Sequence, residues 1–300
     1  MSGDSRVHSR GDVEWWPPIG ALEEVWQYET LAPVERDVLL ARILLDIVSG
    51  QLSMAGSIDR WNKGWKEQHD AFLASQDVES LVPKYVRPLQ PMRIEQELVR
   101  TCNPYFERDW WRLFLDWLAT KYLFTLPGPL LEFGCGSGWN VAHLAAKPGA
   151  PMIYGLDWSP WSVTIMKDLR RLYGYNVEGV KYDFFNPAGA EMHLGKTATV
   201  LTVGALEQTG DRFRPFIDEL VRQKPGLCVH VEPIIEWYDQ TNLVDLTAVM
   251  FLRKRGYWWG FPAYMSKLER EGKVEIVETR RTYVGSKYME GYMLFVWRPL

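Results

Sequence analysis

Hydrophobic residues in the second half of the chain form short continuous runs. These runs lie at 130–133, 152–156, 179–182, 198–203 and 227–232. Between them, apolar residues recur every three or four positions, as expected of helices. Strands buried on both faces have continuous apolar runs, and their alternation with helices is typical of parallel sheets. The pattern therefore predicts an α/β fold with a doubly wound, Rossmann-like sheet.

The end of the chain has a different pattern. Two further strands are predicted at 274–284 and 292–297, joined by 285–291, and this arrangement favours an antiparallel C-terminal hairpin. A helix is predicted before them at 239–255, and it ends in Arg253, Lys254 and Arg255. We interpret that basic run as favourable charge at a helix C-terminus rather than as a phosphate-binding patch.

Residues 1–126 are rich in tryptophan and predict mostly helix. The chain has 15 tryptophans, and eight of them precede Pro127. Pro33 is suited to begin a helix through 34–48 that is apolar almost all round, which predicts burial against other helices or a second subunit. The segment 15–18 predicts an exposed or docking aromatic cluster.

The run at 130–133 leads directly into glycines 134, 136 and 138, and a helix is predicted to follow. Glycine allows positive φ and a close approach to the backbone, and a helix N-terminus favours an anionic group. The dinucleotide fingerprint would need glycine where Trp139 stands. A tight turn without a ligand is the alternative interpretation.

Glu132 followed by G-x-G-x-G resembles the first motif of class I S-adenosylmethionine-dependent methyltransferases. Three later segments agree in order: Asp157 ends the second strand, Asp183 ends the third, and Leu206 to Asp211 resembles L-E-H-x-x-D with Gln208 at the histidine position. The resemblance implies S-adenosyl-L-methionine as cofactor, with Asp157 at the ribose and Asp183 at the adenine amine. The expected cofactor-binding residues are Glu132, Gly134, Cys135, Gly136, Gly138, Asp157, Trp158, Asp183, Phe184 and Gly204.

The resemblance places the substrate over the ends of the fourth and fifth strands. The candidate catalytic residues there are Glu207, His230 and Glu232, since the two-residue period puts His230 and Glu232 on one face. A satisfied core histidine is the alternative for His230. The expected substrate-binding residues are Gln208, Glu236, Tyr238, Trp61 and Trp65, with core packing as the alternative for both tryptophans. No metal is expected, because Glu232, Glu236 and Asp239 lack recognisable ligand spacing.

Composition narrows the function further. The 34 basic and 38 acidic residues give a net charge of -4, which makes nucleic acid an unlikely partner. No signal segment is evident, no run is long enough to span a membrane, and the three cysteines suit a reducing cytoplasm. The carboxylates and tryptophans favour a polyhydroxylated or amine-bearing substrate over a polyanion.

Together these observations predict two regions. Residues 127–300 are expected to form a cytoplasmic S-adenosylmethionine-binding domain that methylates oxygen or nitrogen of a small molecule, such as a sugar or a specialised metabolite. Residues 1–126 are expected to be a substrate cap or an oligomer contact, and the oligomer in question would be a homo-oligomer. The alternatives are an RNA or protein methyltransferase and a non-catalytic scaffold subunit that binds the cofactor.

Overall fold

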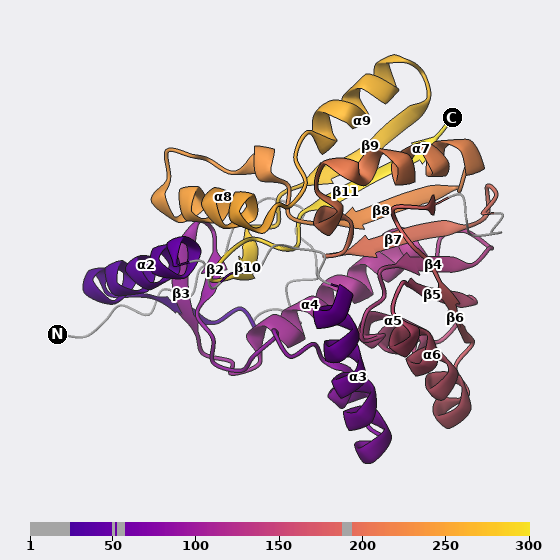
Figure 1. The fold of residues 1–300 in the computed structure, drawn as a ribbon, viewed down its shortest axis with the longest axis horizontal. Coiled ribbons are helices and arrows are strands. Elements are labelled where there is room, and N and C mark those ends of the chain that lie inside the picture. Colours follow the sequence, from indigo (N-terminus) through magenta and orange to yellow (C-terminus); the bar gives the residue numbers. More distant parts are fainter. Residues whose placement is uncertain (1–24, 50–51, 53–57, 188–193) are drawn as a thin grey trace.

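A computed structural model describes residues 25–49, 52, 58–187 and 194–300, and its centre is a seven-stranded sheet (Figure 1). The aromatic cluster expected at 15–18 lies outside these residues. The strand order is β6-β5-β4-β7-β8-β11-β9. The first five are mutually parallel, and β11 is antiparallel to both β8 and β9. Their bounds are β4 (Leu130–Phe133), β5 (Ile153–Asp157), β6 (Val177–Lys181), β7 (Thr199–Val203), β8 (Leu227–Val231), β9 (Val274–Arg280) and β11 (Leu294–Pro299).

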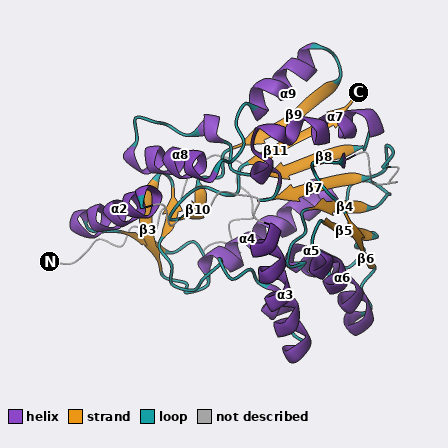
Figure 2. Ribbon diagram, in the orientation of Figure 1, coloured by secondary structure: helices purple, strands orange, loops and turns teal. Residues whose placement is uncertain are grey.

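Helices cover both faces of this sheet (Figure 2). Successive strand residues face opposite sides, so Leu130 belongs to one buried cluster and Leu131 to the other. The Leu130 cluster includes residues of α4 (Phe106–Leu118), α5 (Trp139–Ala145) and α6 (Pro160–Tyr173). The Leu131 cluster includes residues of α7 (Arg214–Gln223), α8 (Leu243–Arg255) and α9 (Phe261–Arg270). The predicted α/β class is confirmed.

A second, antiparallel sheet pairs three strands from the N-terminal region with one strand from the C-terminal region. Its order is β1-β3-β2-β10, with bounds β1 (Tyr28–Thr30), β2 (Met92–Ile94), β3 (Glu97–Thr101) and β10 (Val284–Ser286). The prediction of one strand over 274–284 was wrong, because the chain leaves the large sheet after Arg280 and Tyr283 has a φ of 59°. The short strands β1 to β3 were missed, since three to five residues show no clear alternation.

The helix expected after Pro33 forms as α2 (Pro33–Val48), but it is not buried all round. Leu40, Ile43 and Ile47 are buried, whereas Val34 is 75% and Val48 is 65% exposed. The helix lies beside α8 at the left of Figure 1. The apolar residues of this helix therefore did not by themselves show which face is packed and which is exposed.

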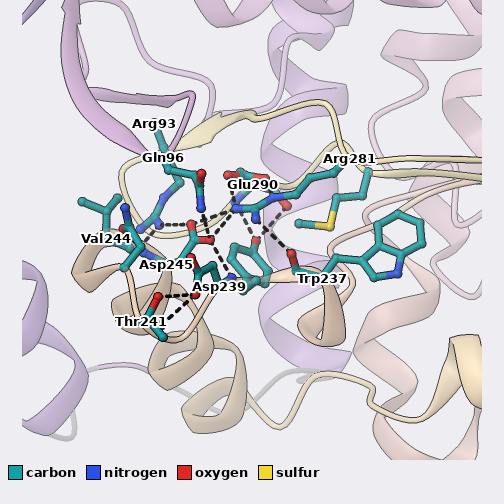
Figure 3. A network of polar contacts seen from close by, with 12 residues as sticks. Arg93, Gln96, Trp237, Asp239, Thr241, Val244, Asp245, Arg281 and Glu290 are labelled. Atoms are coloured by element: carbon teal, nitrogen blue, oxygen red, sulfur yellow. Dashed lines mark hydrogen bonds and ion pairs between the residues drawn. The ribbon is translucent and has the colours of Figure 1, made fainter.

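Buried charges fasten the second sheet to the C-terminal part of the chain (Figure 3). Arg281 donates to Asp245 at 2.7 Å and to Glu290 at 2.6 Å. Arg93, on β2, lies 3.7 Å from Asp245, donates to the Val244 carbonyl and is fully buried. Two arginines thus offset two carboxylates away from water, which is the condition for tolerating buried charge.

The remaining described elements are short or peripheral. They are α3 (Ile58–Ser75), η1 (Val78–Leu81), η2 (Ala119–Leu123), η4 (Leu206–Phe213) and η5 (Ile235–Trp237). In the described part of the chain, no helix combines the length and apolar character needed to cross a membrane.

Candidate active site

The glycine loop between β4 and α5 adopts a conformation that only glycine takes readily. Gly134, Gly136 and Gly138 have φ values of 79°, 51° and 73°. A Cβ on Gly134 would lie 2.3 Å from the Ala205 Cβ, so this glycine also lets the loops after β4 and β7 meet. Cys135 is buried within the loop, where its carbonyl accepts from the Gly138 N–H at 2.8 Å.

Asp157, at the end of β5, holds this loop in place. One carboxylate oxygen accepts the Gly136 N–H at 2.9 Å, and the other accepts the Ser159 N–H at 2.8 Å. The residue is 5% exposed, and burial raises its pKa to about 6. Because each carboxylate oxygen has two lone pairs, a ribose hydroxyl could still donate to Asp157. Sequence reasoning missed the tethering role.

Glu132, on β4, has an unsatisfied oxygen beside the same loop. Its Oε1 accepts from Asn140 Nδ2 at 2.7 Å, whereas Oε2 has no hydrogen-bond partner among the described residues. Burial raises the pKa of Glu132 to about 8. An orphaned buried oxygen next to a helix N-terminus fits a ligand that carries both an ammonium and a carboxylate, as the cofactor does.

Trp61 and Trp65 lie at this loop rather than in the core. Their rings stack at 5.1 Å on α3, and both residues are half-buried. A Cβ on Gly136 would lie 2.8 Å from Trp65 Cζ2, so the indole rests against the loop. Both tryptophans therefore pack at the glycine loop, and they stay candidates for contacts to a ligand bound there.

Glu232 follows β8 and binds backbone N–H groups at the start of η4. It accepts from Ala205, Leu206 and Glu207 at 3.1 to 3.3 Å and is fully buried. These donors occupy the carboxylate, so Glu232 organises the segment after β7. This position does not fit the expected catalytic role.

Glu207 has a free oxygen in the same segment. It is 1% exposed, and its Oε2 has no hydrogen-bond partner in the described structure. Burial and the neighbouring Glu232 carboxylate raise its pKa well above the usual value. A carboxyl in this state donates a hydrogen bond when protonated and becomes a strong base once ionised.

His230 is a core histidine, which corrects the expected catalytic role. Trp297 Nε1 donates to His230 Nε2 at 2.9 Å, which leaves Nδ1 to donate to Thr202 Oγ1 at 2.9 Å. The residue is fully buried, and burial lowers its pKa to about 3. Both ring nitrogens are occupied, so His230 stabilises the packing between β7, β8 and β11.

A cavity of about 730 Å³ lies beyond the ends of β7 and β8, and its lining begins at Gln208, the residue after the buried Glu207. Gln208 and Glu236 line it, in agreement with their expected location. Glu236 also accepts the Gly260 N–H. Tyr238 is misplaced by the prediction, because it is buried and its hydroxyl donates to the Glu290 carbonyl at 3.1 Å.

The remaining expected cofactor residues follow the neighbouring strands. Asp183 is exposed and accepts the Phe185 N–H at 2.9 Å. Phe184 is half-buried and packs on Phe216, with ring centroids 4.9 Å apart. Trp158 is half-buried after β5, and Gly204 is exposed after β7. All four therefore stay candidates.

Three residues that the sequence reasoning missed lie near the acids: Tyr85, Glu107 and Tyr292. Burial of its hydroxyl raises the pKa of Tyr85, and nearby charges, with Glu107 the largest, add to the effect. The side chain as a whole is 59% exposed. Glu107 accepts from the Tyr292 hydroxyl at 2.8 Å, and burial raises its pKa to about 7. In the sequence, the prolines around Tyr85 indicate only that this segment is extended.

Within the described residues, no group of three or more histidines, cysteines or carboxylates could hold a metal ion. The groups described above at this edge of the sheet are carboxyls, phenols, indoles and backbone N–H groups, which suit binding of an organic cofactor and transfer of a proton.

No family model matches this chain, and no curated protein matches its sequence. Among solved structures, the [4+2]-cyclase SpnF has 15% identity and a TM-score of 0.49, over 78% of this chain and 95% of that one. An O-methyltransferase family protein from Burkholderia thailandensis has 13% identity and a TM-score of 0.47, over 64% and 57%. The dimethyltransferase RosA from Streptomyces davawensis has 16% identity and a TM-score of 0.45, over 65% and 56%.

This chain thus spans little more than half the length of the last two proteins. At such low identities and scores, these likenesses carry no argument about activity, and the fold is assigned from the sheet itself. Five parallel strands make up most of the sheet, and the antiparallel β9–β11 pair completes it at one edge. The strand β4, which leads into the glycine loop, lies between β5 and β7. This is the doubly wound sheet with an antiparallel C-terminal pair that the sequence predicts, and in this arrangement it resembles the fold of class I S-adenosylmethionine-dependent methyltransferases.

Proposed function

We propose that the chain is an S-adenosylmethionine-dependent methyltransferase that acts on oxygen or nitrogen of a small molecule. Two features that follow the parallel strands support the proposal. The first turn of α5 has backbone N–H groups without a side-chain cap, and the orphaned Glu132 oxygen lies on the strand before it. The cavity is lined by Gln208 and Glu236, which follow β7 and β8.

The cofactor, when bound, supplies an activated methyl group whose leaving group is already in place. The N–H groups in the first turn of α5 would hold its carboxylate, and Glu132 would hold its ammonium. Asp157 would accept from the ribose, Asp183 from the adenine amine, and Phe184 or Trp158 would cover the ring. Cys135 and Gly204 would contribute backbone contacts. These assignments extend the expected roles to positions that lie along one edge.

Glu207 is the proposed proton acceptor. Its raised pKa and its unpartnered oxygen suit a group that takes a proton from a hydroxyl or an amine during methyl transfer. Gln208 and Glu236 would contact the substrate, since both line the cavity. Trp61, Trp65 and Tyr85, which come from the N-terminal region, would exclude water and restrict the orientation of the reactants. Residues 25–126 would thus act as a cap over residues 127–300.

Incubation with methyl-labelled cofactor and a lysate of the source organism tests the proposal. Small molecules are then separated from RNA and protein before counting. Label among the small molecules is the expected result, and it should disappear in a Glu207→Gln variant that still binds the cofactor. Label in RNA or protein would replace the proposal with a macromolecular methyltransferase. Cofactor binding with no label in any fraction would favour a non-catalytic scaffold.

A further inference from the structure

The cavity beyond the ends of β7 and β8 contains more arginine than the sequence reasoning expected. Arg212, Arg253 and Arg255 line it, together with the carboxylates of Asp211 and Glu236. The three cations and two anions leave one formal positive charge at the cavity wall. Glu207 is buried and is not part of this wall.

Two of these arginines are available to a ligand. Within the described part of the chain, neither Arg212 nor Arg253 forms an ion pair. The Arg212 guanidinium lies 3.8 Å from the centroid of the Phe185 ring, which holds it open rather than collapsed onto a carboxylate. Arg253 is exposed at the last turn of α8. A guanidinium without a carboxylate partner is suited to bind the planar oxygens of a carboxylate or a phosphate.

The third arginine is already engaged. Arg255 is 8% exposed and hydrogen bonds to Tyr257, and its charge acts on the Glu207 carboxyl. Arg255 therefore lines the cavity and also acts on Glu207, the proposed proton acceptor. A ligand held by Arg212 and Arg253 would lie in the cavity that Arg255 lines.

The wall between these side chains is formed by two closely packed loops. A Cβ on Gly210, which has a φ of 62°, would lie 3.0 Å from the Gly256 carbonyl oxygen. The Trp258 N–H also donates to the Glu207 carbonyl at 2.8 Å. The loop that carries Arg212 is thereby fixed to the segment that follows Arg253, so the cavity does not depend on a mobile surface side chain alone.

We propose that this cavity binds an oxyanion through Arg212 and Arg253, and that the methyl acceptor is a small molecule with one carboxylate or phosphate group. The identification of the ligand as the acceptor rests on the proposed function. The volume of about 730 Å³ is within the roughly 300–1,000 Å³ range of small-molecule sites. Asp211 and Glu236 at the same wall, and the net charge of -4, oppose a polyanion. The run that ends α8 therefore does more than favour the helix dipole.

The full chain is titrated with inorganic phosphate and, separately, with acetate, at constant ionic strength set with chloride. Binding is followed by the shift in thermal unfolding temperature, and cofactor binding is measured in parallel by calorimetry. We expect one of the two anions to stabilise the wild type. The Arg212→Gln and Arg253→Gln variants should each bind that anion about tenfold more weakly, because each loses a charge-assisted hydrogen bond. The preferred anion distinguishes a phosphate from a carboxylate group.

Arg298→Gln is the matched control, since it removes the same charge from an exposed ion pair with Glu275 on β9. Its anion binding should equal that of the wild type. No stabilisation by either anion, or equal loss in the control, would overturn the inference even if the cofactor binds. Anion binding without cofactor binding would keep the oxyanion site and overturn the proposed function. Tighter binding of a single-stranded RNA than of either anion, lost in both variants, would replace the small molecule with a nucleic acid.

Discussion

The Trp65 indole rests against Gly136, and a Cβ on that glycine would lie 2.8 Å from the ring. This contact joins the N-terminal helix α3 to the loop that is proposed to hold the cofactor. Glycine at 136 is thus required twice, by its φ of 51° and by the ring above it. A ligand that extends along the loop would meet this ring.

Trp65→Ala should weaken cofactor binding by about 1 kcal/mol, because a half-buried aromatic ring beside the loop is lost. Calorimetry with S-adenosylmethionine measures the change. Trp259→Ala is the control, since this tryptophan is 66% exposed and lines the 730 Å³ cavity instead of the glycine loop. Tighter binding in Trp65→Ala would show that the indole blocks the loop instead of covering the ligand.

Arg281→Met should destabilise the fold by about 3–5 kcal/mol, because it leaves the buried Asp245 and Glu290 carboxylates without their main cation. Urea unfolding measures the difference. Arg298→Met, which breaks an exposed ion pair, should cost less than about 1 kcal/mol. Adding Glu290→Gln to Arg281→Met should recover part of the loss. Equal effects of the two arginine substitutions would show that the buried cluster adds nothing specific.

The features that could be predicted from sequence are those with a local physical signature. The glycines at 134, 136 and 138 were recognisable because their backbone conformation excludes other residues, and the strand runs were recognisable because both faces are buried. Tyr85 was not, since only tertiary packing brings an extended segment beside Glu107 and Glu132.

The error at His230 and Glu232 has a different cause. The two-residue period correctly gave the parity of the strand, but β8 ends at Val231. Beyond that point, Glu232 binds the N–H groups of the loop after β7, while His230 stays between Thr202 and Trp297. Two residues on the same face of a strand therefore did not share a site. The groups that donate to the Glu232 carboxylate come from the loop after β7, which the pattern of β8 cannot reveal.

Glu132→Gln should make the protein relatively more stable as pH rises. The folded pKa of Glu132 is raised from 4.5 to about 8, so the native state keeps a proton that the unfolded chain loses. Between these values, wild-type stability falls with rising pH, by about 5 kcal/mol in total. Glutamine removes this term and still accepts from Asn140. Urea midpoints from pH 5 to 8 test it, and parallel curves for the two proteins would contradict it.

Glu207→Gln tests the proposed proton acceptor with a side chain of nearly the same shape. Burial raises the pKa of Glu207 well above its usual value, which favours the neutral carboxyl, and glutamine resembles that form. The variant should fold and bind the cofactor with unchanged affinity. Its turnover should be slower than that of the wild type by at least about 100-fold.

The pH dependence of the rate gives the sharper result. Only the ionised carboxylate accepts a proton, so the wild-type rate should rise with pH as Glu207 ionises, and the variant's rate should not. Glu236→Gln is the control, because Glu236 is exposed at the cavity wall and its substitution should leave the pH profile intact. If Glu207→Gln keeps the wild-type profile at a reduced rate, Glu207 only orders the loop, and another group accepts the proton.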